Sequence, residues 1–576
     1  MNNRRNVRRS PRNKGRRTGR GGCLFVLFGV CLLTFSVWQG WKEWMPNFEY
    51  ATPDTTIKQP ITWQGNSTSY GAYGSGKSLM IPLSIIQNKI IPQAIYEAAS
   101  NQVILTNDSD VAALPLNATK GIWNGEIKDW KIATQEINGE IYVPMAVLEK
   151  LGVAQAFEYE ESGAVQLVLP GEQLQYGETV QSDKPDVTYT MREQPDRKAA
   201  IVKKLPAQAK ITIWDSQDGW VHIQDDEGSF GYIQESAVKK TDVWSMPAAE
   251  AVEKPSFVQN NTPVSLAWEA VYSRNPDPEA LPDMPGVNVI SPTWFSLADD
   301  EGNVNAKANK ELVKWAHAEN KHVWALYSNS FEPERTTESL ATFERRNRTI
   351  QQLLQFMKQY DLDGINIDYE NVNVEDRDKL TQLVRELTPQ FHRQGLVVSI
   401  DVTAKSTSGN WSMFLDREAL GRSVDYMMVM AYDEHWASSP KAGSVASLPW
   451  AEQSVQRIMD EDNVPASKLV LGMPLYTRIW TETVENGETK VSSKAVGMET
   501  IKQWIADNKL TPVMNESTGQ HYAELTLDGE TQRVWIEDTT SIQARIDMAK
   551  QMNLAGVAVW ARTFGDDSIW KVLNYS

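Results

Sequence analysis

The chain has 576 residues, too many for one hydrophobic core, so its length predicts three or four domains. Hydrophobic residues make up 41% and charged residues 23%, which excludes a wholly disordered or fibrous protein. The net charge is −17, but nine basic and no acidic residues fall in the first 22 positions, leaving 48 basic and 74 acidic residues in the rest. So acidic a body is not expected to bind nucleic acid, and we interpret its charge as solvated surface.

An uncharged run of 16 residues, from Cys23 to Trp38, follows the basic tail of residues 1–22. With its glycine and tryptophan flanks it reaches the length of about 20 residues that a helix needs to cross a bilayer. A cleaved signal peptide is the alternative, but the flank QGWKEWMP has no cleavage site of small residues. We predict a single transmembrane anchor over 23–41 in the cell membrane, with the N-terminus cytoplasmic and the body on the cell-wall side.

Cysteines and histidines argue against metal chemistry. Both cysteines, Cys23 and Cys31, lie in the predicted anchor, so the body has no thiol for a disulfide or a metal. The six histidines show no metal-ligand spacing. We expect no metal and no other cofactor.

Residues 71–78, GAYGSGKS, match the phosphate-binding pattern G-x-x-x-x-G-K-[ST]. That pattern binds phosphate only between a strand and the start of a helix. Here polar residues precede it, and a strand-like run interrupted by Pro82 follows. We interpret the segment as part of a Gly/Ser linker over 42–78 and expect no nucleotide ligand.

Residues 79–172 alternate short apolar runs with turn signals, as in a small α+β module. The stretch GEIYVPMAVLEKLG, a strand that runs into an amphipathic helix, resembles the copper amine oxidase N-terminal-like domain. The segment contains no His or Cys, so the resemblance implies no copper here.

Residues 185–242 contain about five strand-like runs, with turn signals at Gly219–Trp220 and Asp226–Gly228. Together with the sequence GSFGYI they resemble bacterial SH3-like domains, which implies a small β-barrel. In cell walls such modules commonly hold glycan or stem peptide, and a passive spacer is the alternative. Residues 243–262, polar and with two prolines, are predicted as the next linker.

From residue 263 to residue 576, strand-like apolar runs alternate with amphipathic helical segments. The eight runs cover residues 265–270, 287–291, 322–327, 363–370, 396–402, 425–432, 468–474 and 556–560. This alternation predicts an α/β fold, the (β/α)8 or TIM barrel. The interval 478–538 is too long for a normal loop, and its KQWIADN helix and following hairpin predict a small inserted α+β subdomain.

The fourth run, DGINIDYE, carries three polar side chains on one face. Because side chains alternate along a strand, Asn366, Asp368 and Glu370 point into the barrel while Ile365 and Ile367 pack outward. Catalytic residues of such barrels lie at the carboxyl ends of the strands. Two acids this close raise each other's proton affinity, which suits one of them to hold a proton near neutral pH; a structural ion pair is the alternative.

Several motifs together resemble family 18 of the glycoside hydrolases. DGINIDYE (363–370) is similar to the family signature D-G-x-D-x-D-x-E, VMAYD (429–433) to its sixth-strand motif, LGMPLYTRIW (471–480) to its seventh and GVAVW (556–560) to its last. With ISPTWFSL and the insertion, the resemblance covers about residues 263–576. The added SH3-like module makes the chain most similar to the branch of bacterial spore-cortex and cell-wall N-acetylglucosaminidases.

This resemblance implies substrate-assisted, retaining hydrolysis of an N-acetylglucosamine-containing polysaccharide, peptidoglycan or chitin. Glu370 would protonate the leaving glycosidic oxygen, and the substrate's own acetamido oxygen would attack the anomeric carbon. Asp368 would orient that acetamido group and stabilise the oxazolinium cation. Tyr432 and Asp433 would hold the same group.

Further residues are expected around this pocket. Trp560 would form its floor beneath the sugar ring, and Met430, which shares the inward parity of Tyr432, part of its wall. Asp363, of opposite parity to the acids, is expected to support the site from behind. Three tryptophans that follow strands either stack further sugars or pack in the core: Trp294, Trp436 and Trp480.

One position departs from the family signature, whose middle aspartate is Asn366 here. In typical chitinases that aspartate can share a proton with the next one, whereas an amide cannot. We therefore expect Asp368 to work mainly as an ionised group, assisted by a hydrogen bond from Asn366.

The sequence thus predicts a membrane-anchored glycoside hydrolase that cleaves β-1,4 bonds after N-acetylglucosamine in peptidoglycan or spore cortex. A chitinase is the nearest alternative, because the anchor and the SH3-like module favour the wall only by association. A non-catalytic glycan-binding barrel is expected to lack the terminal glutamate, and Glu370 is present. A structural scaffold would leave the complete set of site residues unexplained.

Overall fold

The computed structural model describes Trp38 and residues 44–52, 56–184, 186–247, 253–485, 488–527 and 529–575. These residues divide into two units. The smaller unit holds the residues up to 72 together with 156–247, and the larger unit holds 73–155 together with the residues from 248 onward.

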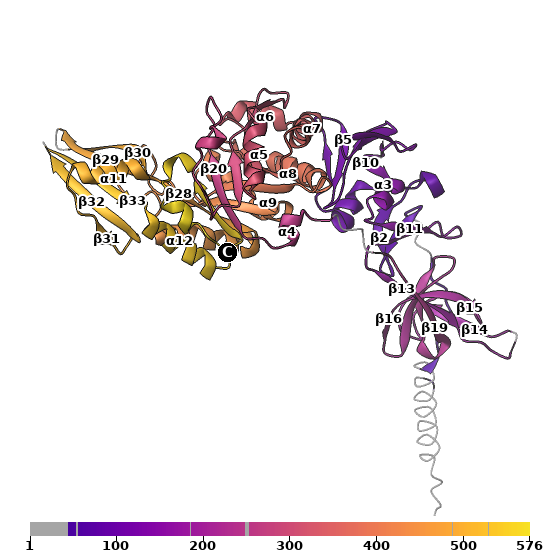
Figure 1. The fold of residues 1–576 in the computed structure, drawn as a ribbon. Coiled ribbons are helices and arrows are strands. Elements are labelled where there is room, and N and C mark those ends of the chain that lie inside the picture. Colours follow the sequence, from indigo (N-terminus) through magenta and orange to yellow (C-terminus); the bar gives the residue numbers. More distant parts are fainter. Residues whose placement is uncertain are drawn as a thin grey trace, which may run out of the picture. The chain divides into compact units, whose positions relative to one another are not determined.

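Eight parallel strands close into a barrel in the larger unit (Figure 1), which confirms the predicted fold. In chain order they are β20 (Val264–Glu269), β21 (Val289–Pro292), β24 (His322–Ser328), β25 (Gly364–Asp368), β26 (Val397–Thr403), β27 (Tyr426–Met430), β28 (Leu469–Pro474) and β34 (Gly556–Trp560). The barrel closes because β21 pairs with both β20 and β24, and β34 with both β20 and β28. Their Val-, Ile- and Leu-rich sequences suit strands that are buried on both faces.

Amphipathic helices cover the outside of the barrel. They include α5 (Lys310–Ala318), α7 (Phe343–Tyr360), α8 (Arg377–His392), α9 (Arg417–Ser423), α10 (Leu448–Asp462) and α12 (Thr539–Gln551). Ile365 and Ile367 of β25 are fully buried in the same core as Leu353 of α7 and Leu383 of α8, as the predicted parity requires. A second core fills the barrel interior and includes Phe257 of the short helix α4 (Ser256–Gln259), which falls within the predicted linker 243–262.

The predicted insertion is an antiparallel sheet with one helix packed on it. Its elements are β29 (Tyr476–Glu485), β30 (Glu488–Gly497), α11 (Met498–Asp507), β31 (Val513–Asn515), β32 (Gln520–Leu527) and β33 (Glu530–Ile536). Ile501 of α11 shares a core with Val496, Val534 and Ile536 of the sheet. Because β29 starts two residues after β28 ends, the insertion grows directly from the carboxyl end of a barrel strand.

Residues 73–155 add two small sheets to the larger unit. One pairs β3 (Met80–Pro82), β10 (Glu140–Pro144) and β9 (Gln135–Ile137), with α3 (Met145–Lys150) directly after β10. The other is a meander of β4 (Ile95–Glu97), β5 (Gln102–Thr106), β6 (Val111–Pro115), β7 (Lys120–Trp123) and β8 (Glu126–Asp129). The meander packs on the barrel's outer layer, because Ile104, Val111 and Ala113 form one buried cluster with Phe343 of α7. The resemblance of this region to the amine oxidase module stays a prediction.

The smaller unit contains the predicted SH3-like region within a sheet of seven antiparallel strands. These are β13 (Gln173–Thr179), β14 (Thr188–Arg192), β15 (Ile201–Pro206), β16 (Lys210–Gln217), β17 (Trp220–Asp225), β18 (Phe230–Gln234) and β19 (Val238–Ser245). A second sheet joins β11 (Gln155–Glu158), β12 (Val165–Val168), β1 (Pro60–Trp63) and β2 (Asn66–Gly71). The segment around Tyr50 bonds through its backbone to Ile201 of β15.

The basic tail 1–22 and the predicted anchor 23–41 lie outside the described residues, apart from Trp38. Among the helices that the structure describes, none is both long enough and apolar enough to cross a membrane.

Candidate active site

The carboxyl ends of β25, β27 and β34 bring most of the predicted site residues together. Asp368 ends β25 and Glu370 follows two residues later, while Met430 ends β27 and Trp560 ends β34. The charges of Asp368 and Glu370 act on the hydroxyl group of Tyr432, so the three side chains lie close together. The motifs are separated by up to 190 residues in the chain and meet because all carboxyl ends of parallel strands lie on one rim of the barrel.

Asn366 is fully buried inside the barrel, and four hydrogen bonds fix its amide. Its Oδ1 accepts from Trp268 Nε1 of β20 at 2.7 Å and from Ser291 Oγ of β21 at 3.3 Å. Its Nδ2 donates to Ser399 Oγ at 3.2 Å and to Asp401 Oδ1 at 2.8 Å, both on β26. Both amide hydrogens are therefore committed, and the expected hydrogen bond from Asn366 to Asp368 is wrong.

Asp368 lies in a water-poor environment. Burial raises the pKa of its carboxyl to about 7. Its Oδ1 is buried and has no hydrogen-bond partner among the described residues. Near neutral pH the Asp368 carboxyl is therefore divided between its two protonation states, and the expectation that it works mainly as an ionised group stays a prediction.

Glu370 is held by its backbone, and its surroundings raise the proton affinity of its carboxyl. The side chain of the fully buried Asn329, just after β24, accepts from the Glu370 N–H at 3.1 Å and donates to its carbonyl at 2.8 Å. Burial, followed by the charges of Asp368 and Asp433, raises the pKa of Glu370 well above its ordinary value. This shift favours the protonated form of the carboxyl, as a general acid requires.

Tyr432 and Asp433 close the side of the site next to the insertion. Burial and the neighbouring carboxylates raise the pKa of Tyr432 well above its ordinary value, so its hydroxyl remains a donor. Asp433 is exposed and has a left-handed backbone, with φ of 61°. Tyr476 Oη of β29 donates to Asp433 Oδ1 at 2.6 Å, and Arg478 Nη2 lies 3.5 Å from the same oxygen. The insertion thus positions this aspartate.

The tryptophans divide into site and core residues. Trp560 is half-buried, with its ring centroid 6.1 Å from that of the fully buried Trp268. Trp294 and Trp480 are 1% and 0% exposed, so both pack in the core and are excluded as sugar-stacking residues. Trp436 is 51% exposed and remains available to a ligand.

Asp363 is a predicted site residue that lies at the end of the barrel opposite the rim. It precedes β25 at the opposite end from Asp368, about 16 Å away at the rise of a β-strand. Its Oδ2 accepts from the Val323 N–H at 2.7 Å and lies 2.9 Å from His317 Nε2, and His322 contacts its other oxygen. Asp363 therefore ties β25 to β24 at the amino end of the barrel and supports the fold.

Sequence reasoning missed residues that contact the site from other strands. Asp401, Trp268 and Asn329 each bond to a site residue and are 3%, 1% and 0% exposed. Asp401 carried a signal, because it is an acid inside the apolar run LVVSIDV and shares parity with Ser399. Its partner could not be named without the pairing between β25 and β26.

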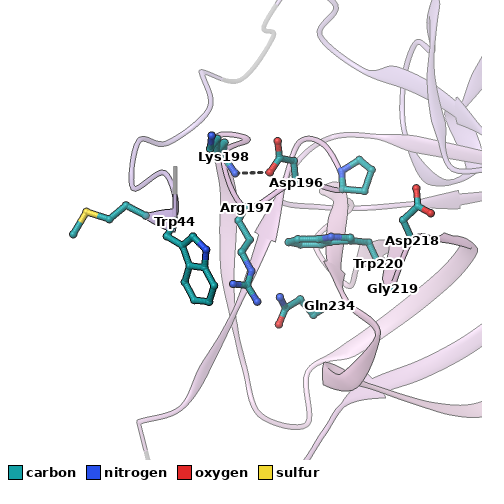
Figure 2. Close-up of a pocket in the computed structure, with 10 residues that line it drawn as sticks. Trp44, Asp196, Arg197, Lys198, Asp218, Gly219, Trp220 and Gln234 are labelled. Atoms are coloured by element: carbon teal, nitrogen blue, oxygen red, sulfur yellow. Dashed lines mark hydrogen bonds between the residues drawn. The ribbon is translucent and has the colours of Figure 1, made fainter. Parts of the chain in front are cut away.

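A second pocket, of about 440 Å³, lies in the smaller unit on the SH3-like domain. Figure 2 shows Trp220, Arg197 and Gln234 around it, with Trp44 on the opposite side. Asp196, Lys198 and Asp218 also line it. The pocket thus offers aromatic faces and charges of both signs to a ligand.

The rim of the barrel therefore brings together a glutamate with a raised pKa, a neighbouring aspartate and a half-buried tryptophan, groups that a glycosidase can use. The model of the glycosyl hydrolases family 18 matches residues 272–565, about half of the chain, and the chain belongs to this family. The bacterial SH3 domain model matches residues 186–240.

Relatives of the chain include glycosylases and cortex-lytic enzymes of Bacillus. An uncharacterized glycosylase, YvbX, of Bacillus subtilis is 27% identical over 306 residues, 50% of this chain and 84% of that protein. The cortical fragment-lytic enzyme of Bacillus subtilis is 27% identical over 234 residues, 40% of this chain and 53% of that protein. The spore cortex-lytic enzyme of Bacillus cereus aligns with 19% identity and a TM-score of 0.49, over 58% of this chain and 77% of that structure. The chain thus spans only about half the length of several relatives that it matches.

Proposed function

We propose that this protein is a retaining N-acetylglucosaminidase that cleaves β-1,4 bonds of bacterial wall glycan, peptidoglycan or spore cortex. The observation that carries the proposal is the pair of acids Asp368 and Glu370 at the carboxyl end of β25, where burial raises the pKa of both carboxyls. Glycosidases need one carboxylic acid to protonate the leaving group and one negative charge near the developing cation.

In this proposal, Glu370 gives its proton to the glycosidic oxygen as the bond to the leaving sugar breaks. The acetamido oxygen of the substrate attacks the anomeric carbon and forms an oxazolinium ion. Asp368, ionised at that stage, stabilises the positive charge and accepts a hydrogen bond from the acetamido N–H. A water molecule then attacks the anomeric carbon and opens the oxazolinium ring. Glu370 acts as the base and takes a proton from this water, which restores its acid form, and the product retains the anomeric configuration.

The remaining site residues orient the sugar. The hydroxyl of Tyr432 is a donor for the acetamido group, and Trp560 presents a flat apolar face to the sugar's C–H groups. Beyond them, Phe331 and Trp411 are 49% and 44% exposed with ring centroids 6.3 Å apart, on the loops that follow β24 and β26. These two loops flank β25, so their rings suit further sugars of a long glycan.

We further propose that the chain acts outside the cytoplasm, held at the cell membrane by residues 23–41. The basic tail before that apolar run supports this orientation. Wall glycan lies on the outer side of the membrane, so an anchored catalytic domain would work on its substrate without diffusing away.

We propose that the pocket of the SH3-like domain binds the cell wall. This proposal leads to a prediction about binding. Trp220→Ala, in a Glu370→Gln background that prevents digestion, should weaken binding of the full chain to purified wall about tenfold, since a buried aromatic anchor contributes roughly 1–2 kcal/mol. Sedimentation with insoluble wall gives the affinity. The control is Val243→Ala, an exposed apolar residue of the same unit that does not line the pocket. Equal binding by both variants would favour a passive spacer.

The activity is tested by incubating the full chain with vegetative wall, spore cortex and chitin oligomers, and reading products by mass spectrometry. New N-acetylglucosamine reducing ends from wall or cortex, absent with Glu370→Gln, are expected and would name the substrate. Cleavage of chitin oligomers alone would assign a chitinase. Binding without cleavage of any substrate would contradict the proposal and favour a glycan-binding barrel.

A further inference from the structure

Asp401 of β26 is a buried acid that the mechanism above does not use. It is 3% exposed and points into the barrel interior, where it accepts the hydrogen bond from Asn366. β25 and β26 pair in parallel, with Asn366 opposite Ser399 and Ile367 opposite Ile400. The next step of this register sets Asp368 beside Asp401, on strands about 4.8 Å apart and with the same parity. The two carboxyl groups are therefore neighbours on the inner face.

One oxygen of Asp368 lacks a hydrogen-bond donor among the described residues. This oxygen, Oδ1, is buried, and a buried carboxylate without a donor is costly. Asn366 cannot donate a hydrogen bond to Asp368, because its amide N–H groups donate to Ser399 and Asp401. A donor on the neighbouring strand would meet this need.

Two adjacent carboxyl groups in one buried place cannot both be ionised, so one of them holds a proton. The titratable groups that act on Asp401 are Asp368 and Glu370, and Tyr432 faces it from beyond β27. Burial, followed by the charges of Asp368 and Glu370, raises the pKa of Asp401 well above its ordinary value. Burial also raises the pKa of Asp368. Asp401 is 3% exposed inside the barrel, whereas Asp368 at the end of β25 is less buried, so a negative charge is better hydrated on Asp368 and this acid is the first of the two to ionise.

We propose that Asp401 is a positioning residue that stays protonated throughout the reaction and donates its O–H hydrogen bond to the ionised Asp368. No proton is transferred in this role, since the O–H bond of Asp401 remains intact while Asp368 stabilises the cation. Asn366 holds the Asp401 carboxyl in place by donating to its Oδ1. Asp401 on β26 thereby supplies the carboxylic acid that this chain lacks at position 366. The inference rests on the proposed glycosidase activity.

The first test compares two substitutions at this position in the full chain. Asp401→Leu removes the donor, so kcat/KM should fall at least tenfold and the acidic limb of the pH profile should rise by about one pH unit, because the Asp368 anion loses its hydrogen bond. Asp401→Asn keeps a neutral group with an N–H donor. It should recover most of that loss, about two- to threefold below the wild type, with the acidic limb back within about half a unit.

Ser399→Ala is the matched control for loosening of the Asn366 amide. It removes the other acceptor of Asn366 Nδ2 and leaves the Asp401 carboxyl in place. A lower rate without movement of the acidic limb is expected. If Ser399→Ala moved the limb as far as Asp401→Leu, or if the Asn and Leu variants lost the same activity, the proposed role of Asp401 would be wrong.

A spectroscopic measurement covers the case in which the Leu variant does not fold or no glycan is cleaved. The infrared difference spectrum of wild type minus Asp401→Asn, at about pH 7.5, should show the carbonyl band of a protonated carboxyl, because Glu370 contributes equally to both proteins. A carboxylate band in its place would show that Asp401 is ionised and would overturn the inference. The spectrum needs no substrate, so it separates failure of this inference from failure of the proposed function.

Discussion

Glu370→Gln should lower kcat/KM by about 10²–10⁴-fold on whichever glycan the full chain cleaves, because a positioned general acid contributes about this factor. Gln has the same shape, so the backbone clamp by Asn329 remains and substrate binding should change little. Steady-state kinetics with an oligomer of defined length gives kcat and KM separately. A fall in kcat at constant KM is expected, since proton donation acts only in the transition state.

The same variant has a predicted effect on stability. Burial, with the charges of Asp368 and Asp433, raises the folded-state pKa of Glu370, so its contribution to stability is present at low pH and is lost as the pH rises through that value. Gln does not ionise, so the Tm of Glu370→Gln should equal that of the wild type at acidic pH and exceed it at about pH 9. Glu311→Gln, on the exposed start of α5, is the control and should change neither Tm nor kcat. Loss of activity in both variants would contradict the assignment of Glu370.

Arg346→Met is expected to destabilise the larger unit by about 3–5 kcal/mol, the cost of leaving a buried carboxylate without its cation. Arg346 of α7 is 1% exposed and bonds to both oxygens of Glu386 on α8, with distances of 3.0 and 2.8 Å. Its Nη2 also lies 2.7 Å from Glu97 Oε1, at the end of β4 in the meander. The substitution therefore breaks the ion pair between two barrel helices and the one between the meander and the barrel. Urea unfolding followed by tryptophan fluorescence measures the loss.

A matched control lies two residues further along the same helix. Arg348 pairs with the exposed Glu301, and both side chains are more than 40% exposed. Arg348→Met should cost less than about 1 kcal/mol, because water screens such pairs. Adding Glu386→Gln to Arg346→Met should recover part of the loss, since the unpaired charge is removed. Equal effects of the two arginine variants would show that the buried network does not stabilise the unit.

Much of the barrel and of its chemistry could be predicted from local patterns. The alternation of apolar runs with amphipathic helices indicated eight strands, and all eight form. Alternating parity along DGINIDYE placed Asn366 inside and Ile365 and Ile367 outside, as found. The insertion was predicted because the 61 residues of 478–538, without barrel periodicity, need a core of their own, and Val534 and Ile501 contribute to one.

Other predictions were wrong, or left two alternatives open, where a side chain could contact more than one partner. Asn366 was expected to bond to Asp368, its neighbour on the strand, but its amide turns to Asp401 and Ser399 on β26. Asp363 was expected near the site, although its place before the strand puts it at the opposite end of the barrel. Trp294 and Trp480 could have stacked sugars or packed in the core, and only their burial decides.

The sequence by itself determined the order of the elements, the inward face of β25 and the acids at its end. These properties depend on spacing along one strand or helix, which a residue's immediate neighbours set. Only the tertiary structure decided that Asp401 lies beside Asp368, that Asn329 clamps Glu370 and that Arg346 joins Glu97 to Glu386. Such contacts join residues up to 249 positions apart, and they depend on strand register and helix packing, which are settled by burial of the whole core.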